Sequence, residues 1–436
     1  MNEFDAIVVG SGVGGMCAAA YLVAGGKRVA LIEKSPYLGG RCSHREREAH
    51  KVTTGALMIP MGPRSAIRQA FDALGVDMDM IDLTGKMRYR LSHGDYDISP
   101  RGGGLLGMIR FAMQNDDEAE VFHQRIVDAL TGWTPLSSIT ILDWFDQYTD
   151  NQEVKNLFQG YCAALMGVNM HEIPASEFFS FLKYHSKGSQ FGMARLGNAH
   201  MMETLANAIV SKGSVVLTQS SCRRILIEEN RVVGVEIKSR GEETQTLLAP
   251  LVLSNAGPRR TIDLAGGLDK FEASYVAEFQ KNDIDAPIMH ASFVLDEPLV
   301  TGFDGCMVFG NTTNLIYLEI PSLISPDISP EGVYLHTAYG APADAAKPDL
   351  NNEFETMLAE LEANFPGVLG RANFLVRAKH RGDSPGMHRW VGRGMPVNTS
   401  VHGLYNVGDG CAPEGTIGTE SAAASAKIAA GMILGT

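Results

Sequence analysis

A glycine-rich turn between two short apolar segments constrains the fold of this chain most strongly. Residues 4–9 (FDAIVV) read as a buried strand, and the sequence GSGVGG follows at once at residues 10–15. An apolar helical segment then continues to about Gly25, and residues 28–32 (RVALI) read as a second strand. Strand, GxGxxG, helix and strand in this order predict a βαβ unit that binds a dinucleotide.

Five residues of the turn have a role in such a site. Gly10 lets the chain turn sharply, Gly12 has no Cβ to keep a pyrophosphate away, and Gly15 lets the helix pack close to the strand. Ser11 and Gly14 complete the turn, whose free N–H groups lie at the positive end of the helix. We therefore expect all five residues to belong to the cofactor site.

An acidic residue ends the second strand. Glu33 follows the turn by about 20 residues, where a carboxylate accepts hydrogen bonds from ribose hydroxyls. Its negative charge would repel a 2′-phosphate, so FAD or NAD is favoured over NADP. Lys34, the next residue, is assigned to the same site.

The residues after Glu33 favour FAD over NAD. Five residues separate Glu33 from Gly39-Gly40-Arg41, and this pattern resembles the extended signature of the FAD-dependent phytoene desaturase and flavin amine oxidase superfamily. The added glycines admit the backbone to the pyrophosphate, and the Arg41 guanidinium suits a phosphate or a flavin carbonyl. The other interpretation is a surface turn with a solvated arginine. We assign Gly40 and Arg41 to an FAD site.

The resemblance implies the fold. It is an α/β architecture, with a Rossmann-type FAD-binding domain assembled from three chain segments and a mixed-sheet plus helical substrate domain. The expected boundaries are residues 1–90, 190–260 and 396–436 for the FAD-binding domain, 91–189 for a helical substrate-domain segment, and 261–395 for a substrate domain with an antiparallel sheet.

The resemblance also implies cofactor contacts further along the chain. Thr54-Gly55-Ala56 stands where phytoene desaturases often have Asp-Ala-Gly, so Gly55 and Ala56 are expected near the flavin ring in an altered form of that contact. Cys222 replaces the usual Val whose backbone contacts adenine. A buried strand from Leu248 ends in Asn255, Ala256 and Gly257, which are assigned to the same site.

The C-terminal segment resembles the last FAD motif of the superfamily. A strand ends at Gly408-Asp409, and Gly418 opens a helix of small residues. Asp409 is expected to accept hydrogen bonds from ribitol hydroxyls, and the helix start to face the flavin O2 side. The residues assigned here are Gly408, Asp409, Ile417, Gly418 and Thr419.

His290 is the candidate catalytic residue. The flavin amine oxidases place a lysine on a substrate-domain strand, and aligning the segment by Glu297-Pro298 puts His290 at that position. Three interpretations are open: a proton relay, a residue that organises a water near flavin N5, or a satisfied histidine in a sheet. The missing lysine, and Gly418 where one wall of an aromatic cage is expected, argue against a simple amine oxidase.

Ordinary packing or a surface position explains several other features. A second GxGxxG at Gly102, Gly104 and Gly107 follows no strand, so it predicts a turn before a helix over 105–113 and not a nicotinamide site. Cys411 is a weak candidate for a covalent flavin link. Other weak candidates for the pocket lining are Glu414, Tyr317, Tyr339, Arg393 and His200.

Composition limits the partners. The net charge of −13 over 436 residues argues against nucleic acid and gives no general attraction to anionic membranes. Six scattered cysteines, no metal-ligand spacing and no run long enough to span a bilayer indicate a cytoplasmic protein without a metal. Glu3 and Asp5 stand where a signal peptide would be basic. Peripheral membrane contact and an oligomer stay open.

The favoured hypothesis is an FAD-dependent oxidoreductase that desaturates or saturates a C–C bond of an apolar, isoprenoid-like substrate by hydride transfer with flavin N5. The apolar substrate rests on the resemblance alone, and neither the direction nor the electron donor or acceptor is fixed. One alternative is an amine or protoporphyrinogen-type oxidase that uses oxygen. Another is a non-catalytic prenyl-protein carrier like the Rab GDP-dissociation inhibitors, against which the intact Gly39-Gly40-Arg41 argues.

Overall fold

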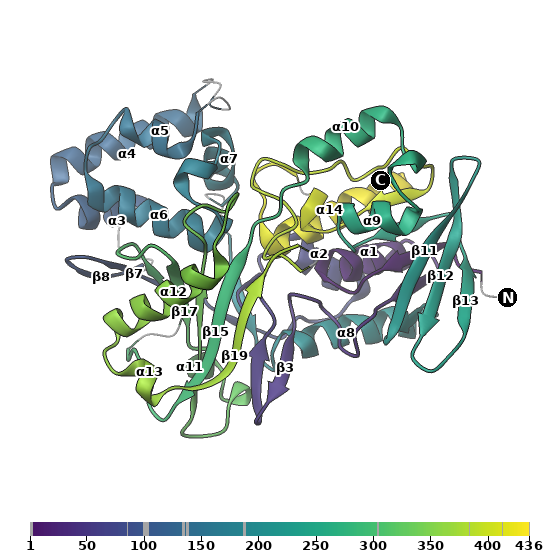
Figure 1. Cartoon of the computed structure of the whole chain (residues 1–436), viewed down its shortest axis with the longest axis horizontal. Helices are drawn as coiled ribbons and strands as arrows, with labels where there is room; N and C mark the ends of the chain where they lie inside the picture. The colour runs from purple at the N-terminus through teal and green to yellow at the C-terminus, as the bar shows by residue number, and fades with distance from the viewer. Residues whose placement is uncertain are drawn as a thin grey trace.

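The computed structural model in Figure 1 describes most of the chain. The described residues are 3–84, 86–98, 104–132, 136, 139–185, 189–302, 305–382, 384–411 and 413–435. Within them, no helix combines the length and the apolar character that crossing a membrane requires.

A parallel sheet organises the cofactor half of the molecule. Its order is β10-β2-β1-β14-β20, and every described pair of neighbours is parallel. The strands come from three separate parts of the chain: β1 Ala6–Val9, β2 Val29–Ile32, β10 Val215–Leu217, β14 Val252–Ser254 and β20 Leu404–Asn406. Such a sheet is buried on both faces, which explains why these strands read as continuous apolar runs.

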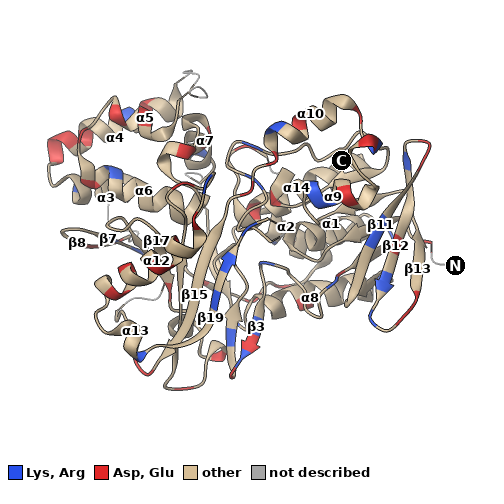
Figure 2. Cartoon of the chain, in the orientation of Figure 1, with Lys and Arg blue, Asp and Glu red and all other residues tan. Residues whose placement is uncertain are grey.

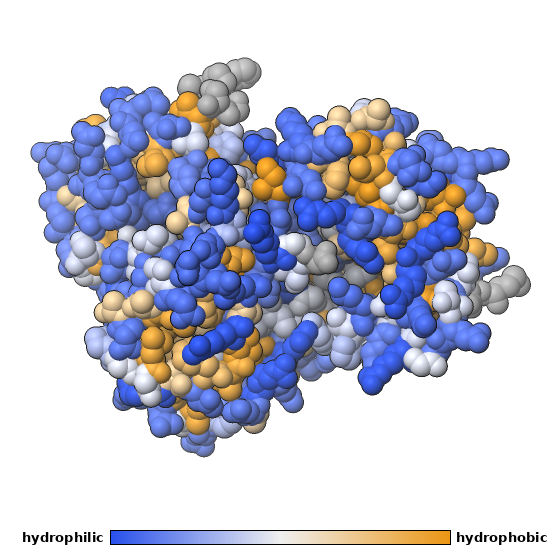
Figure 3. Space-filling view, in the orientation of Figure 1, coloured by the Kyte–Doolittle hydropathy of each residue, from blue (hydrophilic) through white to orange (hydrophobic). Residues whose placement is uncertain are grey.

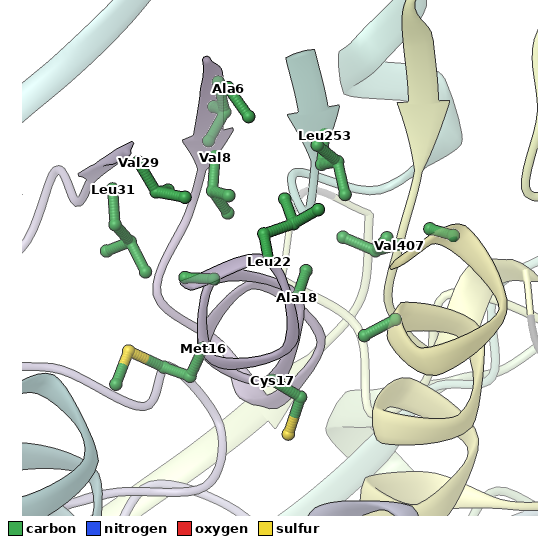
Figure 4. Close-up of a cluster of buried hydrophobic side chains, with 14 of the residues drawn as sticks. Ala6, Val8, Met16, Cys17, Ala18, Leu22, Val29, Leu31, Leu253 and Val407 are labelled. Atoms are coloured by element: carbon green, nitrogen blue, oxygen red, sulfur yellow. The ribbon is translucent and has the colours of Figure 1, made fainter. Parts of the chain in front are cut away.

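Helices cover this sheet. They are α1 Val13–Ala24, α2 Ala66–Leu74, α8 Asn198–Ser211, α9 Pro258–Ala265, α10 Ala273–Asn282 and α14 Gly418–Leu434. Figure 4 shows Leu22 of α1 facing Val8 and Leu253 of two adjacent strands. A separate antiparallel sheet, β11 Ser220–Glu228, β12 Arg231–Ser239 and β13 Thr244–Leu248, lies at the right in Figure 1 and contains the predicted hairpin.

A seven-stranded sheet organises the other half. Its order is β19-β15-β18-β17-β16-β7-β8. The strands are β7 Met87–Leu91, β8 Gly94–Asp97, β15 Ile288–Leu295, β16 Cys306–Phe309, β17 Leu315–Glu319, β18 Tyr334–Gly340 and β19 Asn373–His380.

The structure extends the expected sheet by two strands. An antiparallel sheet within 261–395 was expected, and the described strands from that range, in the order β19-β15-β18-β17-β16, pair antiparallel. β7 adds to β16 in parallel, so the whole sheet is mixed, as the predicted fold class has it. The expected boundary at residue 90 falls inside β7, and β8 lies in a segment expected to be helical. The two strands form a short local hairpin, which periodicity did not reveal.

Helices flank both faces of the seven-stranded sheet. On one side lie α3 Gly104–Met113, α4 Asp116–Thr131, α5 Ile141–Asp146, α6 Gln152–Met166 and α7 Ala175–His185, with the 3₁₀ turn η1 Met170–Glu172 (Figure 1, upper left). The aromatic-rich sequence of α7 is core, as expected, because Phe178 and Phe179 are buried. The helix predicted after the second GxGxxG is confirmed as α3, whereas Gly102 lies outside the described residues.

The remaining elements are short or peripheral. On the opposite face are α12 Leu350–Asn364 and α13 Val368–Arg371, with α11 Pro321–Ile324 nearby. Small sheets are formed by β3 His44–Arg47 and β4 His50–Thr53, and by β5 Ile59–Pro60, β6 Met80–Asp82 and β9 Phe191–Ala194. Single 3₁₀ turns are η2 Leu268–Lys270, η3 Pro326–Ile328 and η4 Asp409–Cys411.

Candidate active site

The described residues enclose a cavity of about 1020 Å³ between the two large sheets. Most of the predicted site residues line it: Gly10, Gly12, Gly14, Glu33, Lys34, Gly40, Arg41, Gly55, Ala56, Cys222, Asn255, Ala256, Gly257, His290, Asp409, Ile417, Gly418 and Thr419. Residues more than 400 positions apart in the sequence therefore line the same cavity. Ser11, Gly15 and Gly408 do not line the cavity, and they lie behind those that do.

The glycines of the first turn are needed for packing as well as for ligand access. A Cβ on Gly12 would lie 2.5 Å from the nearest atom of the Asn255 side-chain amide, and one on Gly14 would lie 2.7 Å from the backbone nitrogen of Gly408. A Cβ on Gly15 would overlap the carbonyl oxygen of Gly10. The expected close approach of helix and strand at Gly15 is thus present. At Gly12 the contact with the Asn255 side chain also requires glycine, which the sequence did not reveal.

Asn255 joins the three cofactor segments. With its amide oriented to satisfy both neighbours, it donates to the Val407 carbonyl at 3.2 Å and accepts from the Gly12 backbone at 3.1 Å. It thereby ties the first turn to the end of β20 across the end of β14. Gly408 then connects the end of β20 to α14, because its N–H donates to the Ser425 hydroxyl of that helix at 2.8 Å.

Glu33 is buried and holds the turn. One of its carboxylate oxygens accepts from the Ser11 backbone at 2.9 Å and from the Ser11 hydroxyl at 2.7 Å, and the other accepts from the Ser35 backbone at 2.7 Å. Ser11 therefore acts through Glu33. Each oxygen of a carboxylate accepts about two hydrogen bonds, so capacity remains for a ligand hydroxyl at the cavity.

Two helix N-termini open onto the cavity. The first residues of α1 and of α14 line it, and neither N-cap residue, Gly12 or Ile417, makes a side-chain capping hydrogen bond. The first N–H groups of both helices are thus available to acceptors on a ligand, and both helix dipoles favour negative charge there. Together with the glycine turn and Glu33, these features fit a dinucleotide with its pyrophosphate at α1.

Arg41 and Asp409 pair with each other. The guanidinium donates to the two Asp409 oxygens at 3.0 and 2.7 Å, and also to the Gly386 carbonyl at 2.5 Å. The His388 backbone N–H adds a further hydrogen bond to Asp409 at 3.0 Å. Burial raises the pKa of the Asp409 carboxyl, but Arg41 and His388 outweigh it and hold the pKa well below its usual range. Separate cofactor contacts were expected for the two residues, whereas the structure joins them in an ion pair.

His290 lies on β15, the strand next to the edge strand β19, and lines the cavity. It is 3% exposed, its Nδ1 lies 3.1 Å from Nε2 of His380, and its Nε2 has no hydrogen-bond partner. Burial is the larger cause, and the charge of the neighbouring His380 the smaller one, of a pKa of His290 that is lowered to about 4. The ring is therefore neutral at pH 7. A buried polar atom without a partner at a cavity wall is a candidate contact for a ligand or a water.

The other weak candidates divide clearly. Tyr317 and Tyr339 line the cavity, and their rings stack on each other with centroids 4.3 Å apart. Glu414, Arg393 and His200 do not line it. Cys411 is also absent from the wall; its thiol contacts the Gly408 carbonyl, and burial raises its pKa, so it is not a reactive thiolate.

Sequence reasoning missed Glu319, a buried carboxyl at the cavity. A signal was present: it follows Tyr317 by two residues in a predicted strand, which puts both side chains on one face of the sheet.

Comparisons with known proteins agree with this geometry. A family model described as an NAD(P)-binding Rossmann-like domain matches residues 8–74. Prolycopene isomerase 2 of an Oncidium hybrid cultivar is 24% identical, over 94% of this chain and 81% of that protein. An oxidoreductase structure from Methanosarcina mazei has a TM-score of 0.85 at 22% identity, over 97% of this chain and 99% of that one. Putrescine oxidase has a TM-score of 0.69 at 16% identity, over 100% and 99%.

The fold and the site define the class: the chain has the fold that these oxidoreductases share, with a Rossmann-like dinucleotide-binding segment over residues 8–74. The predicted resemblance to phytoene desaturases and flavin amine oxidases is confirmed, and the sequence similarity to prolycopene isomerases points to the desaturase-like branch.

Proposed function

We propose that the chain binds FAD and transfers hydride between a carbon of an apolar, isoprenoid-like substrate and flavin N5. One observation carries this proposal: a single cavity runs from the glycine turn and Glu33 to a wall of apolar side chains. The apolar part is built from several elements and includes Met58, Met87, Leu165, Phe181 and Phe191.

The residues present support a position for each part of the cofactor. Glu33 would accept from the adenosine ribose, and the backbone near Cys222 would face adenine. The Gly10–Gly14 turn would hold the pyrophosphate, while Asp409 and the start of α14 would face the ribitol and the ring. When bound, FAD would supply two-electron hydride chemistry, and the chain would supply orientation and environment.

Isomerisation of a polyene is the second candidate function. The full-length similarity to prolycopene isomerases favours it, and the same cavity would serve. Prolycopene is accordingly the first substrate to test. In saturation, desaturation and isomerisation alike, the reacting carbon–carbon bond of the substrate would lie at the apolar end of the cavity.

The arrangement of aromatic residues disfavours the amine oxidase alternative. An aromatic cage needs a gap between two rings, whereas Tyr317 and Tyr339 are stacked 4.3 Å apart and leave no room for an amine. His290, neutral at pH 7, replaces the expected lysine. The similarity to prolycopene isomerases over 94% of the chain also argues against a non-catalytic carrier.

The expected partners remain a small apolar substrate and a redox donor or acceptor of undefined kind. Charged residues of both signs are interspersed over the outer elements (Figure 2), and apolar residues on the face in Figure 3 lie in separate patches among hydrophilic ones. We propose only transient, peripheral contact with a membrane for uptake of substrate. The cytoplasmic location and the oligomeric state stay predictions.

The visible spectrum of the purified protein tests the cofactor assignment. We expect an oxidised-flavin band at close to one FAD per chain, bleached by dithionite, with FAD released on heating. Anaerobic protein with reduced flavin is then expected to convert prolycopene in detergent micelles, followed by chromatography. Colourless protein that takes up no added FAD would contradict the proposal.

A further inference from the structure

A buried acid at the apolar end of the cavity is not used by hydride transfer. Glu319 ends β17, is 3% exposed, and lines the cavity. Its Oε2 has no hydrogen-bond partner. A buried carboxyl oxygen without a partner costs stability, so its presence at a cavity wall points to a functional role.

The sheet places Glu319 on the cavity face by register. Glu319 lies opposite Cys306 of β16, and Cys306 lies opposite Met87 of β7. Residues directly opposite each other on neighbouring strands share a face, and all three line the cavity. On the same face, Tyr317 pairs with Tyr339, which pairs with His290.

The surroundings keep Glu319 protonated. Burial raises its pKa to about 8, and only a hydrogen bond with Tyr339 opposes this shift. The titratable groups that interact with it are Tyr339, Tyr317 and Cys306, and burial raises the pKa of each, so all three are neutral at pH 7. No cation contributes to its shift within the described part of the chain.

Glu420 shows the contrast with a structural carboxylate at the same cavity. It is equally buried and also lines the wall, but it accepts from the Ser65 hydroxyl at 2.7 Å, the Ala66 backbone at 2.9 Å and the Tyr184 hydroxyl at 2.7 Å. Its hydrogen bonds hold α2, α7 and α14 together. Glu319 has no comparable structural task.

We propose that Glu319 is a general acid that protonates a carbon of an alkene substrate in this cavity. The inference rests on the proposed function and defines its direction. The O–H bond of Glu319 breaks while the π pair of the alkene forms a new C–H bond, which leaves a carboxylate and a cation delocalised along the polyene. The stacked Tyr317 and Tyr339 rings offer π faces to that cation.

The cation can lead to isomerisation or to saturation, and the protons and electrons balance in both reactions. After rotation about the C–C bond, return of the proton from the same carbon to the Glu319 carboxylate re-forms the double bond, so isomerisation needs no net oxidant. If instead a hydride is delivered to the cationic carbon from a two-electron donor, reduced flavin, the bond is saturated and Glu319 regains its proton from solvent. A proton donor at this position favours isomerisation or saturation over desaturation.

Infrared spectroscopy of the holoprotein tests the protonated acid without any substrate. Difference spectra between about pH 6 and about pH 10 are expected to show loss of a protonated-carboxyl band with a midpoint of about 8. The band should be missing in Glu319→Gln. It should persist in Glu177→Gln, which removes another carboxyl of raised pKa that does not line the cavity.

Activity completes the test. With prolycopene and reduced flavin, Glu319→Gln is expected to lower the rate at least about 100-fold, Glu319→Asp to recover part of it, and the wild-type rate to fall as pH rises through about 8. Flavin content and dithionite bleaching should stay as in the wild type.

The outcomes separate this inference from the cofactor proposal. An ionised Glu319 at pH 7, an unchanged rate in Glu319→Gln, or no conversion of prolycopene by the wild type would overturn it, while bound and reducible FAD would leave the oxidoreductase assignment intact. If Glu319→Gln loses flavin or fails to fold, the infrared titration and the pH profile of the wild type decide whether Glu319 is a protonated acid that takes part in the reaction. Protein without FAD would contradict the proposed function, yet the infrared titration would still report on Glu319.

Discussion

Replacing Gly15 with alanine is expected to abolish flavin binding and to destabilise the fold by about 3 kcal/mol or more. The new methyl group would overlap the carbonyl oxygen of Gly10, which is backbone and cannot move aside as a side chain can. Relief of the overlap requires α1 to shift away from β1, and this shift would also displace the N–H groups at the start of the helix. Flavin content after purification and urea unfolding measure the two effects.

Gly370→Ala is the matched control for this change. Gly370 also lies in a helix, α13, but nothing stands within 4 Å of the position its Cβ would take. Alanine there should stabilise the protein by up to about 1 kcal/mol, because glycine is the poorer helix former. Flavin retained at wild-type level by Gly15→Ala would show that the turn tolerates a wider separation of helix and strand than the structure indicates.

The parts of this site that the sequence could predict are local. The turn from Gly10 to Gly15 and the acid at Glu33 lie in one βαβ unit, whose strand and helix periods fix which residues meet. The start of α14 at Gly418 is equally local, since a glycine before a run of small residues defines it.

What could not be predicted depends on how distant strands pair. Arg41 and Asp409 are 368 residues apart, and each was assigned a cofactor contact because nothing in the sequence shows that they meet. Likewise, the surroundings of Glu319 depend on the parallel pairing of β16 with β7, a strand that was assigned to the other domain. A charged residue in an apolar strand was the available signal, but its missing hydrogen bond is visible only in three dimensions.

Asp409→Asn is expected to give the second large effect. The change removes the charge that pairs with Arg41 and leaves a guanidinium facing a neutral amide. Loss of one partner of a buried pair costs about 3–5 kcal/mol, and the partial exposure of Arg41 reduces the expected loss to about 2–3 kcal/mol. Flavin affinity should fall at least about tenfold, because Arg41 and the start of α14 both border the space that Asp409 organises.

The dependence on pH distinguishes the charge from simple packing. The folded pKa of Asp409 lies below its unfolded value of 3.8, so its stabilisation is fully present above that value and is lost as pH falls further, through the folded pKa. The difference in unfolding free energy between wild type and Asp409→Asn should therefore be constant from about pH 5 to 8 and shrink below about pH 4. Asp72→Asn, which breaks the exposed pair with Arg68 on α2, is expected to cost less than about 0.5 kcal/mol. Equal losses in the two variants would mean that the Arg41–Asp409 pair is no stronger than a surface ion pair, and the site would then have to be organised chiefly by the glycine turn and Asn255.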